Sequence, residues 1–223
     1  MAIQIDFLKR IPYFLDIGSS ELSSIAKLIF EKKAEAGEML LLEDETTEVL
    51  YFVISGVVKV FKISAEGKEQ ILNMARPGDS FNDVTVFDGG PNPASVQAIG
   101  PVILYGIKKG DLETILRDHP QVVLNVINVL ATRIRYLVSL VEDLSFKHVV
   151  GRVAKILLEY AGDGTGSGQR LTQQDMAAMA GTVREVVGRS LKILQRSGAI
   201  RLDRHRIVIT DKDALRKAIE APA

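Results

Sequence analysis

The chain contains no cysteine, only three histidines and no excess charge of either sign, because 28 Lys and Arg residues balance 28 Asp and Glu residues. Without cysteine it can form no disulfide framework, no cysteine-ligated iron–sulfur cluster and no thiolate-ligated haem. Redox sensing by a cysteine thiol is therefore excluded.

The sequence also shows neither the pattern that predicts a secretory leader nor a long apolar run. No basic segment precedes an apolar core at the N-terminus, and no apolar run approaches the roughly 20 residues that a membrane-spanning helix needs. We therefore expect a soluble, cytoplasmic protein without a membrane partner. At 223 residues, the chain is longer than a typical single domain, which favours two folded units.

Residues 31 to 107 consist of short apolar runs separated by turn signals. The dipeptides Ser55-Gly56, Glu66-Gly67 and Pro77-Gly78 occur where hairpin turns are needed. This pattern predicts an antiparallel β sandwich or jelly roll. A metal-dependent cupin enzyme has a similar barrel, but it binds its metal through clustered histidines, and the predicted barrel contains none.

From Leu112 onwards the apolar spacing becomes helical. One stripe, which we name the dimer seam, recurs at the coiled-coil intervals of four and three and consists of Val123, Ile127, Leu130, Ile134, Leu137, Val141 and Leu144. A seam on one long helix predicts a twofold homodimer in which this helix pairs with its copy. The alternative is that the stripe docks on the β domain of its own chain.

After a second predicted helix over residues 147–160, the stretch AGDGTGSGQR contains four glycines. It follows a helix and lacks the Lys-Ser/Thr ending of a phosphate-binding loop, so it is interpreted as a flexible connection. LTQQDMAAMAG then predicts a helix capped by Thr172 and Asp175, with Gly181 in the following turn.

The stretch TVREVVGRSLKILQRSGAI, residues 182–200, predicts a helix that begins with a Thr182 and Glu185 capping box and ends at Gly198. One side is apolar and is expected to pack: Val183, Val187, Leu191 and Leu194. The opposite arc is expected to project and consists of Arg184, Glu185, Arg189, Lys192, Gln195 and Arg196.

Basic residues are concentrated in this part of an otherwise neutral chain. Residues 183–206 contain seven basic and two acidic side chains, which indicates a local site for a polyanion. The runs AIRLD and RIVIT that follow predict a small hairpin. Two helices joined by a glycine-containing turn, with a basic second helix and a basic wing, are typical of a winged helix-turn-helix.

The stretch LTQQDMAAMAGTVREVVGRSLKILQRSGAIRL resembles the helix-turn-helix of the Crp/Fnr transcription regulators. AGEMLL, LYFVISGVVKVFK and RPGDSFNDVTVFDGG are similar to the sensor β-roll of that family, and domain order agrees over almost the whole chain. The resemblance implies an α+β fold in three parts: a cyclic-nucleotide-binding-like β-roll (jelly roll) over 1–118, a dimerisation helix and hinge over 119–146, and a winged helix-turn-helix over 147–223.

The resemblance also implies roles for individual side chains. In the family, an Arg-Glu-x-x-x-Arg set reads base edges, and here it corresponds to Arg184, Glu185 and Arg189. Arginine can bond guanine at two points, and glutamate can accept from cytosine. The candidate phosphate contacts, which add affinity without sequence preference, are Thr172, Gln173, Thr182, Lys192, Arg196 and Arg204. Glu185 has the competing role of capping its own helix, and a solvated helix face is the competing interpretation for the arginines.

The predicted effector pocket departs from that of the cyclic-nucleotide responders, which hold the phosphate with an arginine and the ribose with a glutamate. Aligned on Phe81 and Phe87, this chain has Asn82 and Asp83 at the Gly-Glu positions and Pro93-Ala94 at the Arg-Ser positions. The adenine-binding positions fall on Leu137 and Val138, which offer no side-chain hydrogen bond. The candidate pocket residues are Asn82, Asp83, Pro93, Ala94, Arg133 and Leu137. Because a buried phosphate without a cation is costly, we expect no response to cyclic AMP.

Other ligands and functions remain as alternatives. Haem is one, although none of His119, His148 and His205 lies in the predicted β-roll, and methionine or the N-terminal amine would then be a ligand. A non-DNA interaction module that binds an acidic protein is another. The sequence contains no Ser-His-Asp or paired-carboxylate constellation and predicts no metal site and no enzyme.

The predicted function is a homodimeric regulator that reads an inverted repeat in double-stranded DNA with TGTGA-like half-sites. RNA polymerase is a candidate further partner, either recruited or blocked. An effector, where one exists, is expected to act through the central helices and a hinge near residues 146–148.

Overall fold

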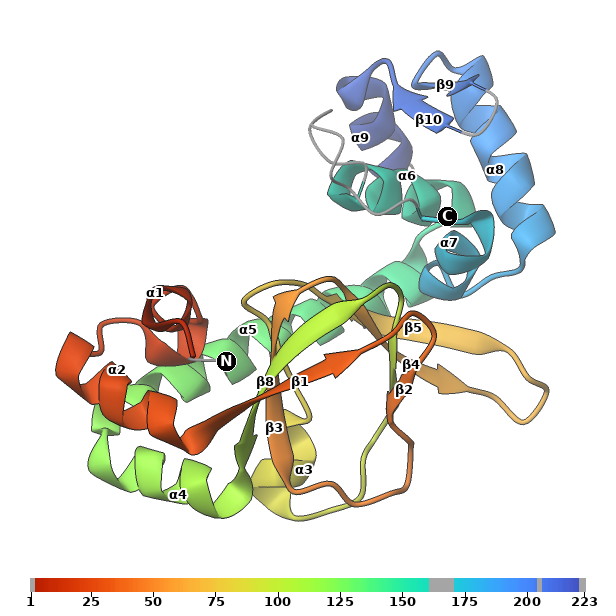
Figure 1. Ribbon diagram of the computed structural model, residues 1–223. Helices are drawn as coiled ribbons and strands as arrows, with labels where there is room; N and C mark the ends of the chain where they lie inside the picture. The colour runs from red at the N-terminus through yellow and green to blue at the C-terminus, as the bar shows by residue number, and fades with distance from the viewer. Residues whose placement is uncertain (1–2, 161–170, 204–205, 221–223) are drawn as a thin grey trace. The chain divides into compact units, whose positions relative to one another are not determined.

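The computed structural model describes residues 3–160, 171–203 and 206–220. The chain forms two compact units, one made of Met1–Lys62 and Leu72–Ile134 and the other of Ile63–Ile71 and Arg135–Ala223. Buried apolar side chains fill the interior of each unit. The fold is mixed α and β, as expected from the sequence (Figure 1).

The elements up to β8 begin with four short helices, and the strands of a β-roll follow, interrupted by the helix α3. In chain order they are α1 (Ile5–Leu8), η1 (Pro12–Phe14), α2 (Ser19–Ile25), η2 (Ala26–Leu28), β1 (Ile29–Ala34), β2 (Met39–Leu41), β3 (Val49–Ser55), β4 (Val58–Ile63), β5 (Glu69–Ala75), β6 (Ser80–Phe81), α3 (Asp83–Asp88), β7 (Ser95–Ala98) and β8 (Val102–Lys108).

The elements that follow are helical apart from one hairpin. They are α4 (Lys109–Asp118), α5 (Pro120–Phe146), α6 (Val149–Tyr160), α7 (Gln173–Met179), α8 (Arg184–Arg196), β9 (Ile200–Asp203), β10 (Arg206–Ile209) and α9 (Lys212–Glu220). The wing strands β9 and β10 pair antiparallel, as predicted. The glycine-rich stretch interpreted as a flexible connection lies outside the described residues.

The β-roll consists of two four-stranded sheets with the strand orders β1-β8-β3-β6 and β2-β7-β4-β5. Alternation along β3 explains how the first sheet covers two cores. Leu50 and Phe52 pack in one apolar cluster with helical residues, whereas Tyr51 and Val53 face the cluster inside the roll. Since successive strand residues point to opposite faces, one apolar run serves both cores. The predicted hairpin glycines 56, 67 and 78 all adopt positive φ.

The helix α3 interrupts the region that the sequence predicts as β structure. Asn82 before it and Gly89 after it both adopt the left-handed backbone conformation, with φ of 70° and 75°. These two left-handed residues are the N-cap and the C-cap of one short helix. The apolar alternation in this segment therefore reflects a half-buried helix rather than a strand.

The helix α5 is 27 residues long, and by length and composition it would suffice to cross a membrane, which corrects the expectation that no apolar run approaches that length. A single helix that passes this test is weak evidence for a membrane span. Two arginines, Arg133 and Arg135, lie within it, and many of its apolar side chains are exposed, including Ile127, Ile134 and Val141.

Candidate nucleic-acid interface

The C-terminal unit contains the predicted helix-turn-helix. Thr172 caps α7 as expected: the Asp175 amide donates to the Thr172 hydroxyl at 3.1 Å, and the Thr172 amide donates to the Asp175 carboxylate at 2.8 Å. Gly181 in the following turn has a φ of 63°, which favours glycine. The turn between α7 and α8 is thus built as the sequence predicts.

The predicted N-cap of α8, Thr182, is wrong by one residue. The helix begins at Arg184, its N-cap is Val183, and no side chain caps it. The Thr182 amide bonds to the Ala177 carbonyl and therefore still belongs to the turn. Glu185 is then the second helical residue, one place too early for a capping box. The capping role that competed with base reading at Glu185 is absent from the structure.

The two faces of α8 divide as the periodicity predicts, apart from the first apolar position. Val187, Leu191 and Leu194 are at most 1% exposed. Val183 is 51% exposed, which corrects the expectation that it packs: as an extended N-cap residue it lies before the helical stripe begins. The predicted projecting residues are all exposed, namely Arg184, Glu185, Arg189, Lys192, Gln195 and Arg196.

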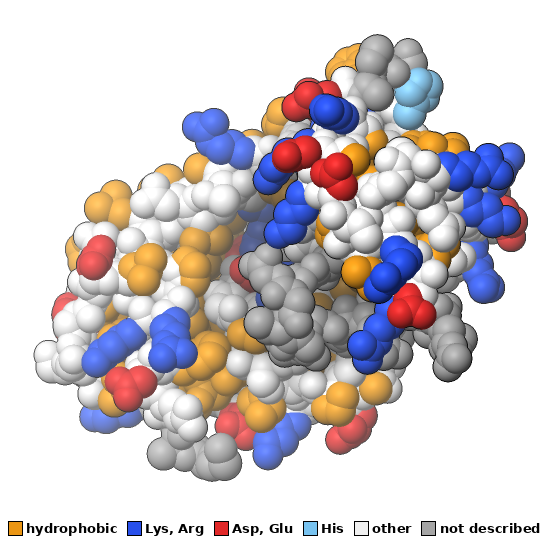
Figure 2. Space-filling model, turned by 90° about the horizontal axis from the view of Figure 1, so that it is seen from above, with side chains coloured by type: hydrophobic (Ala, Val, Ile, Leu, Met, Phe, Trp, Pro, Cys, Tyr) orange, Lys and Arg blue, Asp and Glu red, His pale blue; other side chains and the backbone are white. Residues whose placement is uncertain are grey.

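Lys and Arg side chains gather along α8, at the right-hand edge of the molecule in Figure 2. Among the described residues, the base-reading candidates Arg184, Glu185 and Arg189 have no ion-pair partner. Of the phosphate candidates, Thr172 and Gln173 are exposed at the start of α7, Thr182 is half-buried in the turn, and Arg204 lies outside the described residues. Burial of one face and exposure of the other makes α8 a rigid support for its charged side chains.

Side chains from α6 and from the β4–β5 hairpin bond to three successive carbonyls, those of Met179, Ala180 and Gly181. Arg152 Nε donates to Ala180 O at 2.8 Å, Lys68 Nζ donates to Gly181 O at 3.1 Å, and Gln70 Nε2 donates to Met179 O at 3.4 Å. These bonds satisfy carbonyl groups at the end of α7 that a helix leaves without internal partners. They hold the segment that positions the start of α8.

Arg152 also joins α6 to the end of α5. Its Nη1 donates to Lys147 O at 2.5 Å and to Asp143 O at 3.4 Å. The Asp143 carboxylate binds Lys147 at 2.6 Å and also binds Lys155. Burial alone would raise the pKa of Asp143, but the hydrogen bonds and charges of the two lysines outweigh it and hold that pKa below its ordinary value.

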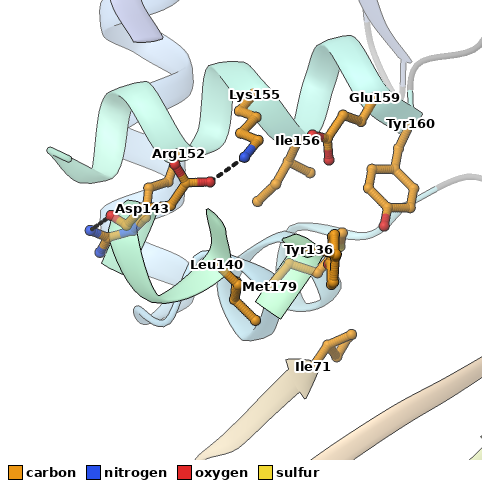
Figure 3. A pocket seen from close by; sticks show the side chains of 10 residues that line it. All are labelled: Ile71, Tyr136, Leu140, Asp143, Arg152, Lys155, Ile156, Glu159, Tyr160 and Met179. Atoms are coloured by element: carbon orange, nitrogen blue, oxygen red, sulfur yellow. Dashed lines mark hydrogen bonds and ion pairs between the residues drawn. The ribbon is translucent and has the colours of Figure 1, made fainter. Parts of the chain in front are cut away.

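These groups border a cavity of about 40 Å³ (Figure 3). Its lining is apolar on one side and charged on the other, and it comprises Ile71, Tyr136, Leu140, Asp143, Arg152, Lys155, Ile156, Glu159, Tyr160 and Met179. The space would hold a few water molecules, whereas ligand pockets measure roughly 300–1,000 Å³. We therefore interpret the cavity as part of the structural junction between the helices.

The predicted effector pocket lies in the other unit, apart from Leu137. Asp83 is 1% exposed and accepts hydrogen bonds from Tyr13, Ser80 and Arg133, the Ser80 bond being 2.7 Å long. Arg133 also donates to Ser80 O at 2.9 Å. Burial and the neighbouring carboxylate of Asp83 raise the pKa of Tyr13, so that the phenol stays protonated and donates. Asp83 is thus committed to an internal network.

Of the remaining pocket candidates, Asn82 is also held by internal hydrogen bonds. Asn82 donates to the carbonyls of Thr47 and Val49 at 2.7 and 2.9 Å. Ala94 is 5% exposed, and Pro93 is exposed. Neither of the last two offers a cation. Leu137 lies on α5 in the C-terminal unit and is 43% exposed.

The histidines in the described part of the chain are His119 and His148. His119 lies 3.2 Å from Glu21 through Nδ1. In that part of the chain no three His, Cys, Asp or Glu side chains gather as a metal site would require. His205 lies outside the described residues.

Comparison with known proteins agrees with this organisation. The cyclic nucleotide-binding domain model matches residues 31–119, and the Crp-like helix-turn-helix domain model matches residues 151–218. The chain is 31% identical over 217 residues to a CRP-like cAMP-activated global transcriptional regulator of Mycobacterium tuberculosis, which covers 94% of this chain and 97% of that protein. It is 28% identical over 227 residues to the anaerobic regulatory protein of Bacillus subtilis, over 96% of this chain and 94% of that protein.

A solved structure, that of FixK2 from Bradyrhizobium japonicum, matches with a TM-score of 0.76 and 26% identity over 87% of this chain and 99% of that one. The Crp-like helix-turn-helix and the exposed basic face of α8 define a DNA-binding transcription regulator. The chain belongs to the Crp/Fnr family of these regulators.

Proposed function

We propose that the protein is a cytoplasmic homodimer that places two copies of α8 in successive major grooves, about 34 Å apart, and reads an inverted repeat with TGTGA-like half-sites. Arg184 and Arg189 bond guanine O6 and N7, and Glu185 accepts from cytosine N4. The observation that carries this proposal is the exposed Arg-Glu-x-x-x-Arg set on a helix whose opposite face is buried.

The phosphate contacts surround this set. Lys192 and Arg196 extend along α8, and Thr172, Gln173 and Thr182 lie at the start of α7 and in the turn. The Thr172 hydroxyl already takes part in the cap, but its second lone pair remains available to a donor and the α7 terminus is exposed. Arg204 of the wing completes the proposed set. These contacts supply affinity that depends on salt and not on sequence.

Exposure along the dimer seam supports the homodimer. Ile127 is 55% exposed, Ile134 61% and Val141 63%, which are high values for large apolar side chains on one stripe. Leu130, by contrast, is partly buried and packs against the apolar cluster that contains Leu50 and Phe52. A continuous apolar stripe at coiled-coil spacing is buried most simply against its own copy. The competing idea, that the seam docks on the β domain of its own chain, leaves these exposures unexplained.

We further propose that DNA binding is independent of cyclic AMP. The M. tuberculosis relative is named as cAMP-activated, and the first domain here matches the cyclic nucleotide-binding model. In this chain, however, the phosphate positions hold Pro93 and Ala94, and the ribose position holds Asp83, which is committed to Tyr13 and Arg133. A cyclic phosphate would then be buried without a cation, at a cost of several kcal/mol.

Selection of bound duplexes from a random pool with ligand-free protein tests this proposal. We expect a palindromic motif with TGTGA-like halves and an affinity that falls steeply with salt. Calorimetry with cyclic AMP is expected to show no micromolar binding that tightens DNA binding. Recovery of no motif would refute sequence-specific reading in the ligand-free state. Run-off transcription on the selected site then shows whether RNA polymerase is recruited or blocked.

A further inference from the structure

Val183 combines two properties that are each unfavourable for the stability of the free protein. It is a large apolar side chain with 51% exposure, and it occupies the N-cap of α8 without a side-chain hydrogen bond to the helix. Serine, threonine, aspartate, asparagine and glycine are preferred at an N-cap, and valine is among the poor choices there. The chain therefore forgoes stability at this position and also leaves an apolar group in water.

Val183 lies beside the residues that we propose to read DNA. The backbone there is held in place, because Val183 O accepts from the amides of Val186 and Val187 at 3.0 and 3.2 Å. The side chain is β-branched and hence restricted at χ1. It directly precedes Arg184 and Glu185, at the N-terminal end of the helix, which is the end that contacts base edges in a helix-turn-helix.

Resting on the function proposed above, we propose that Val183 is a specificity-determining residue that contacts the 5-methyl group of a thymine in each half-site. The thymine methyl is the apolar feature that base pairs present in the major groove. A rigid isopropyl group beside two base-reading side chains is complementary to it. Contact with this methyl removes from water the apolar surface that the free protein leaves exposed.

Replacing thymine by deoxyuridine removes this methyl and changes no hydrogen-bonding group. We would scan the selected duplex in this way, one thymine pair per half-site at a time, against the wild type, Val183→Ala and Ile193→Ala. Ile193 is the matched control, because it is 50% exposed on the same helix but lies far from the N-terminal end. Fluorescence anisotropy gives the affinities.

For the wild type and Ile193→Ala we expect one thymine position at which methyl removal weakens binding about fourfold per half-site, as burial of one methyl group predicts. For Val183→Ala this position should lose its effect. Val183→Ser should raise Tm by about 2–4 °C through a restored cap while abolishing the same methyl effect. A residue with a merely structural role would not give a higher Tm together with a loss of the thymine-methyl preference.

The outcomes separate this inference from the function on which it rests. If the wild type selects a motif but no deoxyuridine position weakens binding, or if the effect persists in Val183→Ala, the thymine contact is refuted and DNA reading stands. If the wild type selects no motif, the proposed function fails and the thymine contact fails with it.

Discussion

At the scale of single residues, the structure decides which side chains of the recognition helix are available to DNA. Capping would have withdrawn Glu185 from the interface, but the helix begins too late for that. Arg184 and Arg189 are both exposed. The proposed division between base-reading and phosphate-binding side chains then leads to separate predictions for Arg184 and Lys192.

Arg184→Ala should weaken binding to the selected duplex by about 1–3 kcal/mol and relax the preference at one guanine, because a two-point hydrogen bond is lost. Lys192→Ala should weaken binding to all sequences to a similar extent and reduce the salt slope by about 1. Competition with single-base variants measures both effects. An equal loss on every sequence for Arg184→Ala would contradict the assignment.

Gly188→Ala separates stability from DNA binding at one position. A Cβ added at Gly188 would meet only Gln173 Oε1, at 3.9 Å, which is ordinary contact. Alanine in a helix interior stabilises by roughly 0.5–1 kcal/mol relative to glycine, so thermal stability should rise. If the duplex approaches the backbone here, the added methyl should weaken DNA binding by about 1–3 kcal/mol through overpacking. A rise in both stability and affinity would show that the duplex stays away from Gly188.

At the scale of elements, the junction of α5, α6 and the helix-turn-helix is held by polar side chains. Asp143 binds Lys147 and Lys155, and Arg152 bonds to carbonyls at the ends of α5 and α7. A buried carboxylate with two cationic partners depends on both of them for its charge. Its charge state therefore links the stability of this junction to pH.

Asp143→Asn tests this link. The folded pKa of Asp143 lies below its ordinary value of 3.8, so its carboxylate stabilises the folded state above that pH. The contribution is lost as pH falls through the lower, folded pKa. Urea unfolding between about pH 7 and pH 2 should therefore show a weaker acid dependence in Asp143→Asn, and a loss of about 1–3 kcal/mol at pH 7. Identical pH profiles of the two proteins would exclude this role.

At the scale of the whole molecule, the proposed function requires two copies of the chain, because reading an inverted repeat needs two recognition helices. The dimer seam lies on α5 and is largely exposed in the single chain. Its apolar character also explains why this helix meets the length and composition of a membrane span.

Ile134→Asp should convert the dimer to monomer, since it places a charge at a seam position that is 61% exposed in the single chain. Ile63→Asp is the control, because Ile63 is 56% exposed on β4 and lies outside the seam. Analytical ultracentrifugation should show a dissociation constant raised at least about tenfold, and palindromic DNA should bind correspondingly more weakly. A monomeric wild type, or a dimer unaffected by Ile134→Asp, would refute the proposal that the dimer seam is the interface between the two copies.

Much of the fold follows from local sequence signals. The turn glycines, the Thr172 cap, the wing hairpin and the apolar stripe of α8 from Val187 onward all depend on neighbouring residues, and all are confirmed. The base-reading candidates were placed correctly on an exposed face for the same reason. The α3 helix was missed because its boundaries depend on left-handed residues at Asn82 and Gly89. An asparagine in the sequence predicts this backbone conformation only weakly.

The sequence by itself determined the class of the protein, because hydrophobic periodicity, turn residues and a basic helix act over a few neighbouring positions. Only the tertiary structure decided three further features: that Val183 rather than Thr182 precedes α8, that Asp83 is bound by Tyr13 and Arg133, and that Arg152 bonds to the turn before the recognition helix. Each depends on groups that are remote in the sequence or on a competition between neighbouring backbone hydrogen bonds. Folding alone brings such groups within bonding distance.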